Sequence, residues 1–204
     1  MKRILTVALA LMAQVIFAGE SMIPSPEIET QINNRRDMVG KEIMDVEFRG
    51  TEKGQTVYLQ DYQNKVVLLY FWTVQNEKII NLKNGYSGLD VVKALQKEFK
   101  INPDIKMLSI NVVDTHEQVM KFLAGRDYAV EMVSDVNCIF YQQQEVGPMT
   151  FLLVDEKGKI IRVMDGLSKM TEGQLKASIH VLLEDKRLSH MKRMEKILVK
   201  NQEL

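Results

Sequence analysis

The sequence predicts an α/β fold in which helices flank a mixed central β-sheet, with an N-terminal β-hairpin and an extended C-terminal helix. Residues 66–72 form a continuous apolar run with β-branched and aromatic side chains, which is typical of a strand covered on both faces. Residues 105–113 are predicted to form another buried strand. Helical patterns alternate with these strands, so the middle of the chain requires parallel crossover connections. A late hairpin adds an antiparallel edge.

The elements of the first half follow from local patterns. Two short strands are predicted over 43–48 and 56–60, around the turn between Gly50 and Gly54. After the strand at 66–72, apolar side chains at helical spacing predict an amphipathic helix over 88–100. The preceding segment 81–88 contains two glycines, so we expect it to split or replace the helix that should follow the strand.

The second half is predicted from its capping and turn residues. Asp114 and Thr115 are suited to cap a helix that runs to about residue 124. A strand over 129–133 and a brief helix over 138–144 follow, and the hairpin consists of strands over 149–154 and 160–164. Thr171 is predicted to begin the long C-terminal helix, with Gln174 completing a capping box.

The composition indicates one globular domain with short appendages. The chain has 204 residues, of which 46% are hydrophobic and 26% are charged, enough for a substantial core. Lys and Arg number 27 and so do Asp and Glu. This balance gives no broad attraction to polyanions, so we expect no nucleic-acid partner.

The N-terminus has the pattern of a secretory signal. Lys2 and Arg3 precede an apolar run over 4–17, and Ala18 with Gly19 offers a small-residue cleavage site. We therefore predict a signal peptide over 1–18, a linker over 19–38, a domain over 39–184 and a separate C-terminal helix over 185–204. The protein is expected to be exported, with the bacterial periplasm as its compartment.

The chain has one cysteine, Cys138, so it forms no internal disulfide and has no cysteine pair for redox cycling. Cys138 is a redox candidate if a helix N-terminus activates it, and a small buried hydrophobe otherwise. The three histidines, His116, His180 and His190, lack the short spacing of a metal site. No metal and no cofactor is expected.

Four strings, in order, resemble exported thiol–disulfide oxidoreductases of the TlpA type, which belong to the thioredoxin-like and AhpC/TSA-redoxin proteins. They are Val39-Gly40-Lys41 with Val46-Glu47-Phe48, the segment 55–62, the run from Lys65 to Trp72, and Val146–Asp155 with the turn that follows it. The resemblance covers about residues 39–184. It implies a thioredoxin-like sheet, and it implies that Pro148 holds the position of the family's cis-proline.

The chain departs from this family at the reactive positions. Counted from Phe71 and Trp72, the two cysteines of the Cys-x-x-Cys motif fall on Asn76 and Ile79. The chemistry needs a thiolate at a helix N-terminus and a second thiol that resolves the mixed disulfide. Neither an amide nor an aliphatic side chain supplies these groups.

Two functions remain open from the sequence. The first is a non-catalytic binding or scaffolding module of the cell envelope that holds a protein partner in a groove. The groove is predicted to involve Trp72, Asn76, Ile79, Gly147 and Pro148. The alternative is a thiol–disulfide redox protein that uses Cys138 with a partner's thiol.

The C-terminal segment 185–204 is predicted to form a basic amphipathic helix. It combines an apolar stripe with six basic and three acidic residues, a net charge of +3. Such a helix is suited to an anionic membrane surface, a like subunit or a partner helix. A solvated helix extension is the alternative, because the stripe is short for a stable coiled coil.

Overall fold

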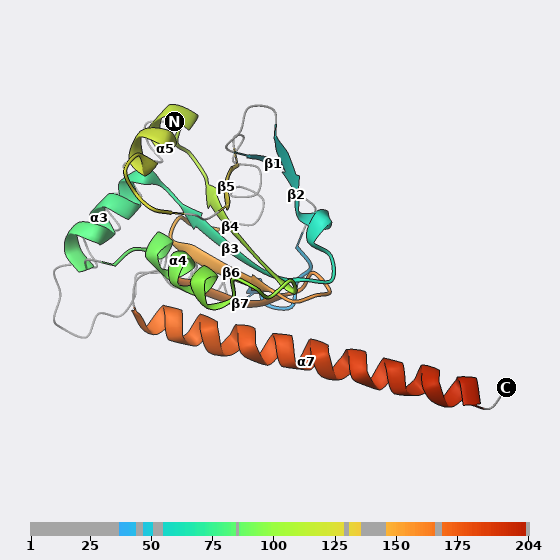
Figure 1. Cartoon of the computed structure of the whole chain (residues 1–204). Coiled ribbons are helices and arrows are strands. Elements are labelled where there is room, and N and C mark those ends of the chain that lie inside the picture. The colour runs from blue at the N-terminus through green and yellow to red at the C-terminus, as the bar shows by residue number, and fades with distance from the viewer. Residues whose placement is uncertain are drawn as a thin grey trace. The chain divides into compact units, whose positions relative to one another are not determined.

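Seven strands of the described residues form one mixed sheet in the computed structural model of the protein, in the order β2-β1-β5-β4-β3-β6-β7 (Figure 1). The structure describes residues 37–43, 47–50, 55–84, 86–128, 131–135, 146–165 and 169–202. The strands are β1 (Glu47–Gly50), β2 (Thr56–Tyr58), β3 (Val66–Trp72), β4 (Ile105–Asn111), β5 (Glu131–Ser134), β6 (Thr150–Val154) and β7 (Ile160–Asp165). The 3-10 turn η1 (Leu59–Tyr62) follows β2.

The sheet is parallel in its middle and antiparallel at both sides, as predicted. β3 pairs with β4 in parallel from Val66 opposite Ile105 to Trp72 opposite Asn111. β6 lies antiparallel on the other side of β3, and β7 continues that edge. The hairpin of β1 and β2 joins the opposite side through β5.

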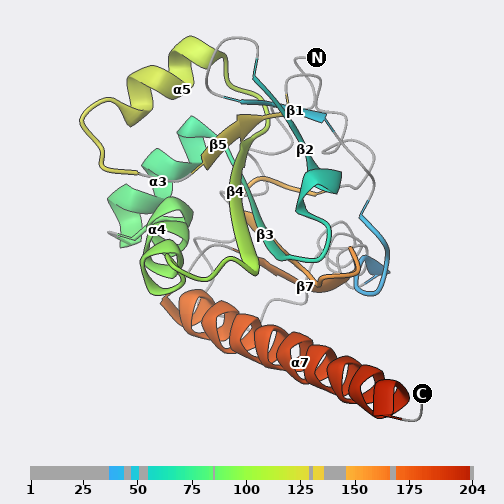
Figure 2. The ribbon, with the colours of Figure 1, turned by 45° about the vertical axis from the view of Figure 1, so that its right-hand side comes forward.

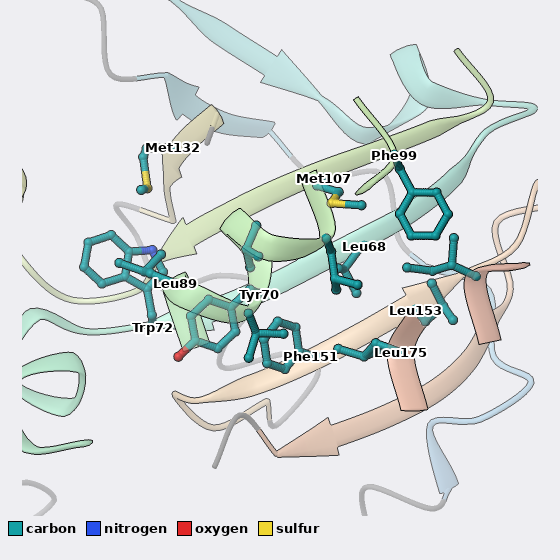
Figure 3. Close-up of a cluster of buried hydrophobic side chains, with 14 of the residues drawn as sticks. Leu68, Tyr70, Trp72, Leu89, Phe99, Met107, Met132, Phe151, Leu153 and Leu175 are labelled. Atoms are coloured by element: carbon teal, nitrogen blue, oxygen red, sulfur yellow. The ribbon is translucent and has the colours of Figure 1, made fainter. Parts of the chain in front are cut away.

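β3 supplies side chains to two cores because alternate residues of a strand point to opposite faces. On one face, Leu68, Tyr70 and Trp72 join a buried cluster with side chains from α4 (Gly88–Glu98), α5 (His116–Leu123) and α7 (Lys169–Gln202) (Figure 3). On the other face, Leu69 and Phe71 pack with Phe48 and Ile160 in a second cluster. Every residue of β3 is buried.

The helices begin at side-chain caps that satisfy their first N–H groups. Ser87 and Asp90 form a capping box on α4, and Thr115 and Gln118 form one on α5. The helix after β3, α3 (Val74–Asn84), ends before α4 begins. The interruption that segment 81–88 predicted therefore lies between α3 and α4, which are separate helices.

The C-terminal helix α7 begins at Lys169, two residues before the predicted start. Thr171 is consequently inside the helix and the predicted capping box with Gln174 is wrong. Leu175 and Ile179 are fully buried against the sheet. Figures 1 and 2 show α7 beside α4 and continuing past the strands.

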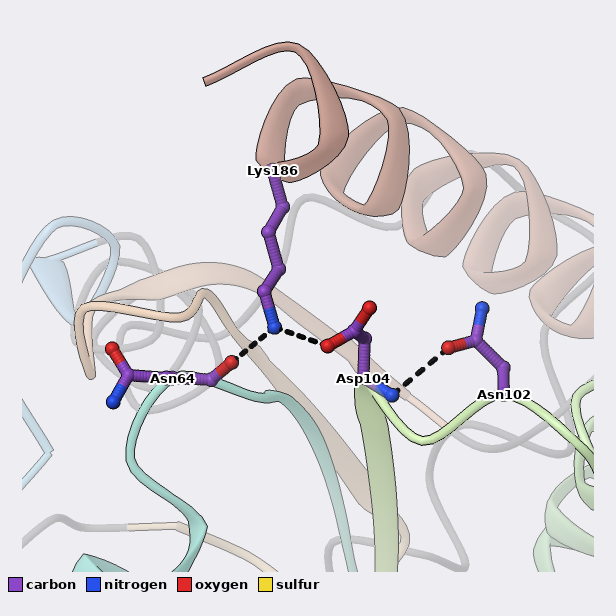
Figure 4. A network of polar contacts seen from close by, with 4 residues as sticks. All are labelled: Asn64, Asn102, Asp104 and Lys186. Carbon is purple, nitrogen blue, oxygen red and sulfur yellow. Dashed lines mark hydrogen bonds and ion pairs between the residues drawn. The ribbon is translucent and has the colours of Figure 1, made fainter. Parts of the chain in front are cut away.

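The predicted domain limits need small corrections. Met38 is only 4% exposed and belongs to the second core cluster, so the domain includes residues assigned to the linker. At the other end, Lys186 still contacts the domain through Asp104, beyond the predicted end at 184 (Figure 4). The predicted signal peptide over 1–18 and the brief helix over 138–144 lie outside the described residues.

Within the described ranges, none of the helices combines the length and the apolar content that crossing a bilayer would demand.

Candidate functional site

The helix α3 (Val74–Asn84) begins where the chain leaves the carboxyl end of β3, and its first two turns hold the positions predicted for the family's two cysteines. Asn76 lies in the first turn of α3 and Ile79 in the second. The side chain of Asn76 is buried at 8% exposure, and that of Ile79 is half-buried. A helix N-terminus carries partial positive charge, which is the property that activates a thiolate in this fold.

This N-terminus is already capped by the protein itself. The backbone N of Val74 donates a hydrogen bond to Oδ2 of Asp114 over 2.7 Å, and the backbone N of Asn76 donates to Oγ1 of Thr73 over 3.1 Å. Asp114 also accepts from Nδ2 of Asn111 over 2.8 Å. The carboxylate that follows β4 therefore occupies the position where this helix end would stabilise an anion. Asp114 caps α3 and not the helix that follows it in sequence, α5, whose N-cap is Thr115.

The predicted groove is only partly supported by where its residues lie. Trp72 is fully buried and its ring packs 5.8 Å from that of Phe122, so it cannot line a surface groove. Gly147 and Pro148 are half-buried. The pairing of Phe71 with Thr150 brings their turn next to the end of β3.

The turn at Pro148 differs from the predicted one. No cis peptide bond occurs among the described residues, so the bond before Pro148 is trans and the cis prediction is wrong. Met149 adopts a positive φ of 71°, and its backbone N donates to the carbonyl O of Phe71 over 2.6 Å. Proline followed by a residue of positive φ is typical of a type II turn, which reverses the chain with a trans bond.

A buried carboxyl group lies one residue after Asn76 and was not recognised in the sequence. Glu77 is fully buried and accepts a hydrogen bond from the hydroxyl of Tyr70 and a longer one, 3.4 Å, from the backbone N of Leu89. Burial raises the pKa of the Glu77 carboxyl above its ordinary value, while hydrogen bonds from Tyr70, Ser87 and Leu89 act to lower it. Burial, and then the neighbouring Glu77, raises the pKa of Tyr70.

A concavity lies between α3 and α5, and none of the predicted groove residues is among those that line it. It has a volume of about 560 Å³ and is lined by Val74, Gln75, Lys78, Asp114, Gln118, Lys121, Phe122 and Arg126. We call it the α3–α5 groove. Three of its lining residues are basic and one is acidic, so its walls favour a negatively charged ligand.

Arg126 is held in place at this groove. Its guanidinium lies 4.2 Å from the centre of the Phe122 ring and donates a hydrogen bond to the carbonyl O of Phe122. Lys78 and Lys121 are exposed, and neither has a carboxylate partner among the described residues. The groove therefore contains one cationic side chain that is held in place, Arg126, and two whose conformation can adapt to a ligand, Lys78 and Lys121.

Cys138 lies outside the described residues. Among the residues that the structure does describe, no group of three or more His, Cys, Asp or Glu side chains is placed to hold a metal ion.

Known structures share the fold. A proposed thiol:disulfide interchange protein, DsbE, from Chlorobium tepidum superposes with a TM-score of 0.61 at 22% identity, covering 71% of this chain and 97% of its own. A thiol-disulfide oxidoreductase from Bacteroides fragilis gives a TM-score of 0.55 at 21% identity, with 67% and 98% covered. A secreted disulfide oxidoreductase of Mycobacterium tuberculosis, homologous to E. coli DsbE, gives 0.53 at 14% identity, with 68% and 96% covered. At these identities the likeness shows the fold alone.

Sequence comparison gives the family. No curated protein matches the chain. The model of the AhpC/TSA family, however, matches residues 39–179, which include all seven strands and the first turns of α7. With its thioredoxin-like fold, the chain belongs to the AhpC/TSA family.

Proposed function

We propose that this protein is an exported, non-catalytic member of its family that binds a protein partner in the cell envelope. One observation carries the proposal. The helix end that holds the reactive thiolate in the Cys-x-x-Cys chemistry carries Asn76 and Ile79 here, and its N–H groups are bound to Thr73 and Asp114. The scaffold is retained while its electron-transfer groups are replaced.

The α3–α5 groove is the binding surface that this proposal uses. Its volume of about 560 Å³ is in the range of sites that hold small ligands or a short peptide segment. Lys78, Lys121 and Arg126 favour a segment with Asp or Glu side chains, and Phe122 offers an apolar contact. The envelope is proposed from the signal-like N-terminus, and the secreted relative from Mycobacterium tuberculosis supports it.

The absence of catalysis is tested by the reduction of insulin disulfides with dithiothreitol as the reductant. We expect the protein to add nothing to the rate with dithiothreitol alone, and an active oxidoreductase serves as the positive control. A Cys138→Ser variant separates the alternative function. Catalysis that disappears with Cys138→Ser would establish a single-thiol redox protein and overturn the proposal.

Binding is tested by the fluorescence polarisation of labelled peptides. We expect a Glu-rich peptide to bind and a Lys-rich peptide of equal length not to bind. The double variant Lys78→Glu/Lys121→Glu should weaken binding at least about 10-fold, since each lost attraction near a surface contributes up to about 1 kcal/mol. Lys100→Glu/Lys157→Glu makes the same charge change away from the groove. Equal loss in both variants would show that net charge, and not the groove, attracts the peptide.

A further inference from the structure

The distal part of α7, residues 187–198, extends beyond the contacts that hold the helix to the domain. The last of these contacts is made by Lys186, whose Nζ donates to the carbonyl O of Asn64 and lies 2.5 Å from Oδ1 of Asp104 (Figure 4). Residues 187–198 are all exposed. At about 1.5 Å per residue, this stretch is about 18 Å long.

The distal part carries large apolar side chains in contact with solvent. Leu188 is 41% exposed, Met191 47%, Met194 45% and Leu198 58%. Their spacing of three, three and four residues places them along one side of the helix. Contiguous exposed apolar surface of this kind marks an interaction site.

This apolar side is not the side that α7 turns toward the domain. The domain-facing residues are Leu175, Ile179 and Lys186, and the same helical series continues to Arg193 and Ile197. Leu188, Met191 and Leu198 lie roughly a quarter to a half turn away from that series. The domain therefore leaves the apolar side open.

The opposite side of the distal part is basic. Lys192, Arg193 and Lys196 lie within about a third of the helix circumference, and all three are exposed. Arg187 forms an ion pair with Glu184 over 2.6 Å. Across residues 187–198, four basic residues and one acidic residue give a net charge of +3.

We propose that the distal part of α7 binds the surface of an anionic lipid bilayer, with its apolar side in the headgroup boundary. A helix with an apolar side and a lysine- and arginine-rich polar side is suited to lie in that plane. Each basic residue near an anionic leaflet contributes about 1 kcal/mol of attraction. The charge complementarity comes from Lys192, Arg193 and Lys196.

A second copy of the chain is a poorer occupant for two reasons. Two distal parts packed together would bring like net charges of +3 side by side. Their heptad seam would run through Leu188, Met191, Glu195 and Leu198, so a carboxylate would occupy a core position. The bilayer surface avoids the first cost, because it is negatively charged and attracts the net charge of +3.

Flotation with lipid vesicles tests the proposal. The protein used begins at Gly19, which keeps every described residue and the whole core while removing the apolar run over 4–17 that would bind vesicles itself. We expect it to float with vesicles of phosphatidylcholine and phosphatidylglycerol and not with phosphatidylcholine alone. The variant Lys192→Glu/Arg193→Glu/Lys196→Glu should lower the partition coefficient on the order of 100-fold. Leu188→Ser/Met191→Ser/Leu198→Ser should lower it by more than about 10-fold.

The control variant is Lys41→Glu/Lys100→Glu/Lys157→Glu, which makes the same charge change at exposed positions of the domain and should keep binding within about 3-fold. The proposal is overturned if the wild-type protein does not bind anionic vesicles, or if the control loses as much binding as the α7 variant. It is also overturned if sedimentation equilibrium shows a dimer that the apolar variant dissociates while vesicle binding is absent. None of these outcomes bears on insulin reduction or peptide binding.

Discussion

Replacing Tyr70 by Phe removes one hydroxyl group from the core and deprives the Glu77 carboxylate of its phenol donor. The two side chains are fully buried, and the Tyr70 ring stacks on Phe151 with centroids 4.3 Å apart. Phe preserves this stacking, so the change isolates the hydrogen bond. A hydrogen bond contributes about 0.5–1.5 kcal/mol between neutral groups and about 1.5–3 kcal/mol to a charged group, and we expect the free energy of unfolding to fall by about 1–3 kcal/mol.

The cost of Tyr70→Phe should depend on pH with a definite sign. Burial raises the native pKa of Glu77 above its ordinary value of 4.5, so the native state holds the proton more firmly than the unfolded state. The stability of the wild type therefore falls as pH rises from that ordinary value through the native pKa. The Tyr70 hydroxyl lowers the pKa of Glu77, so its removal raises that pKa further and prolongs the fall to higher pH.

The measurement is urea-induced unfolding of both proteins from about pH 4 to about pH 8. The difference between them should be smallest at the acid end, where Glu77 is protonated in both states, and should grow toward neutral pH because the variant has the higher native pKa. Tyr58→Phe, at a 38% exposed position, should show a small difference that does not change with pH. If the cost of Tyr70→Phe stayed constant across the pH range, the reasoning that Tyr70 lowers the native pKa of Glu77 would be refuted.

Three further substitutions test the packing by urea-induced unfolding. Gly88→Ala should cost about 1–3 kcal/mol because its Cβ would overlap the Tyr70 phenol, whereas Gly173→Ala, with open space around it in α7, should stabilise by about 0.5–1 kcal/mol. A Gly88→Ala variant that is more stable than the wild type, or a Gly173→Ala variant that is less stable, would contradict this reasoning. Asp114→Ala should cost about 1 kcal/mol through loss of the cap on Val74, and an unchanged stability would show that the cap is dispensable. Ile179→Ala should cost about 2–5 kcal/mol, but Ile197→Ala, 46% exposed, should change stability by less than about 0.5 kcal/mol; similar costs would mean that the distal part of α7 contacts the core.

The elements most accurately predicted from the sequence are those whose signal is local. The strands predicted over 66–72 and 105–113 are β3 and β4, with ends within two residues. The signal is strongest for β3, whose side chains are all apolar or aromatic and all buried. The start of α5 was likewise predicted from Thr115, which caps the helix within its first turn; the second partner of its capping box, Gln118, was not predicted. The start of α7 was misplaced because Thr171 resembles a cap but is buried inside the helix.

The site was harder to predict because its contacts are distant in sequence. Lys78 and Lys121 lie on different helices, 43 positions apart, and no local pattern shows that they face one groove. Glu77 looked like an ordinary polar residue of a helix, and only tertiary packing buries it against Tyr70. Trp72 is a different case. The alternation of β3 places it on the same face as Leu68 and Tyr70, so the burial that excludes it from a groove was readable from the strand itself.

The two cores of the domain do not depend on the side chains at positions 76 and 79, which belong to neither core cluster. Leu68, Tyr70 and Trp72 pack on one face of the sheet, and Leu69 and Phe71 pack on the other. The buried side chains of β3 and its neighbours therefore contribute the main stabilisation of the domain. Positions 76 and 79 begin a helix whose end is secured by Thr73 and Asp114 with no sulfur involved. A fold of this kind holds its reactive groups at an edge, and they can be exchanged without disturbing the core. The strands that build these cores lie within residues 39–179, which match the AhpC/TSA family, whereas the proposed binding surfaces, the α3–α5 groove and the distal part of α7, lie outside the sheet.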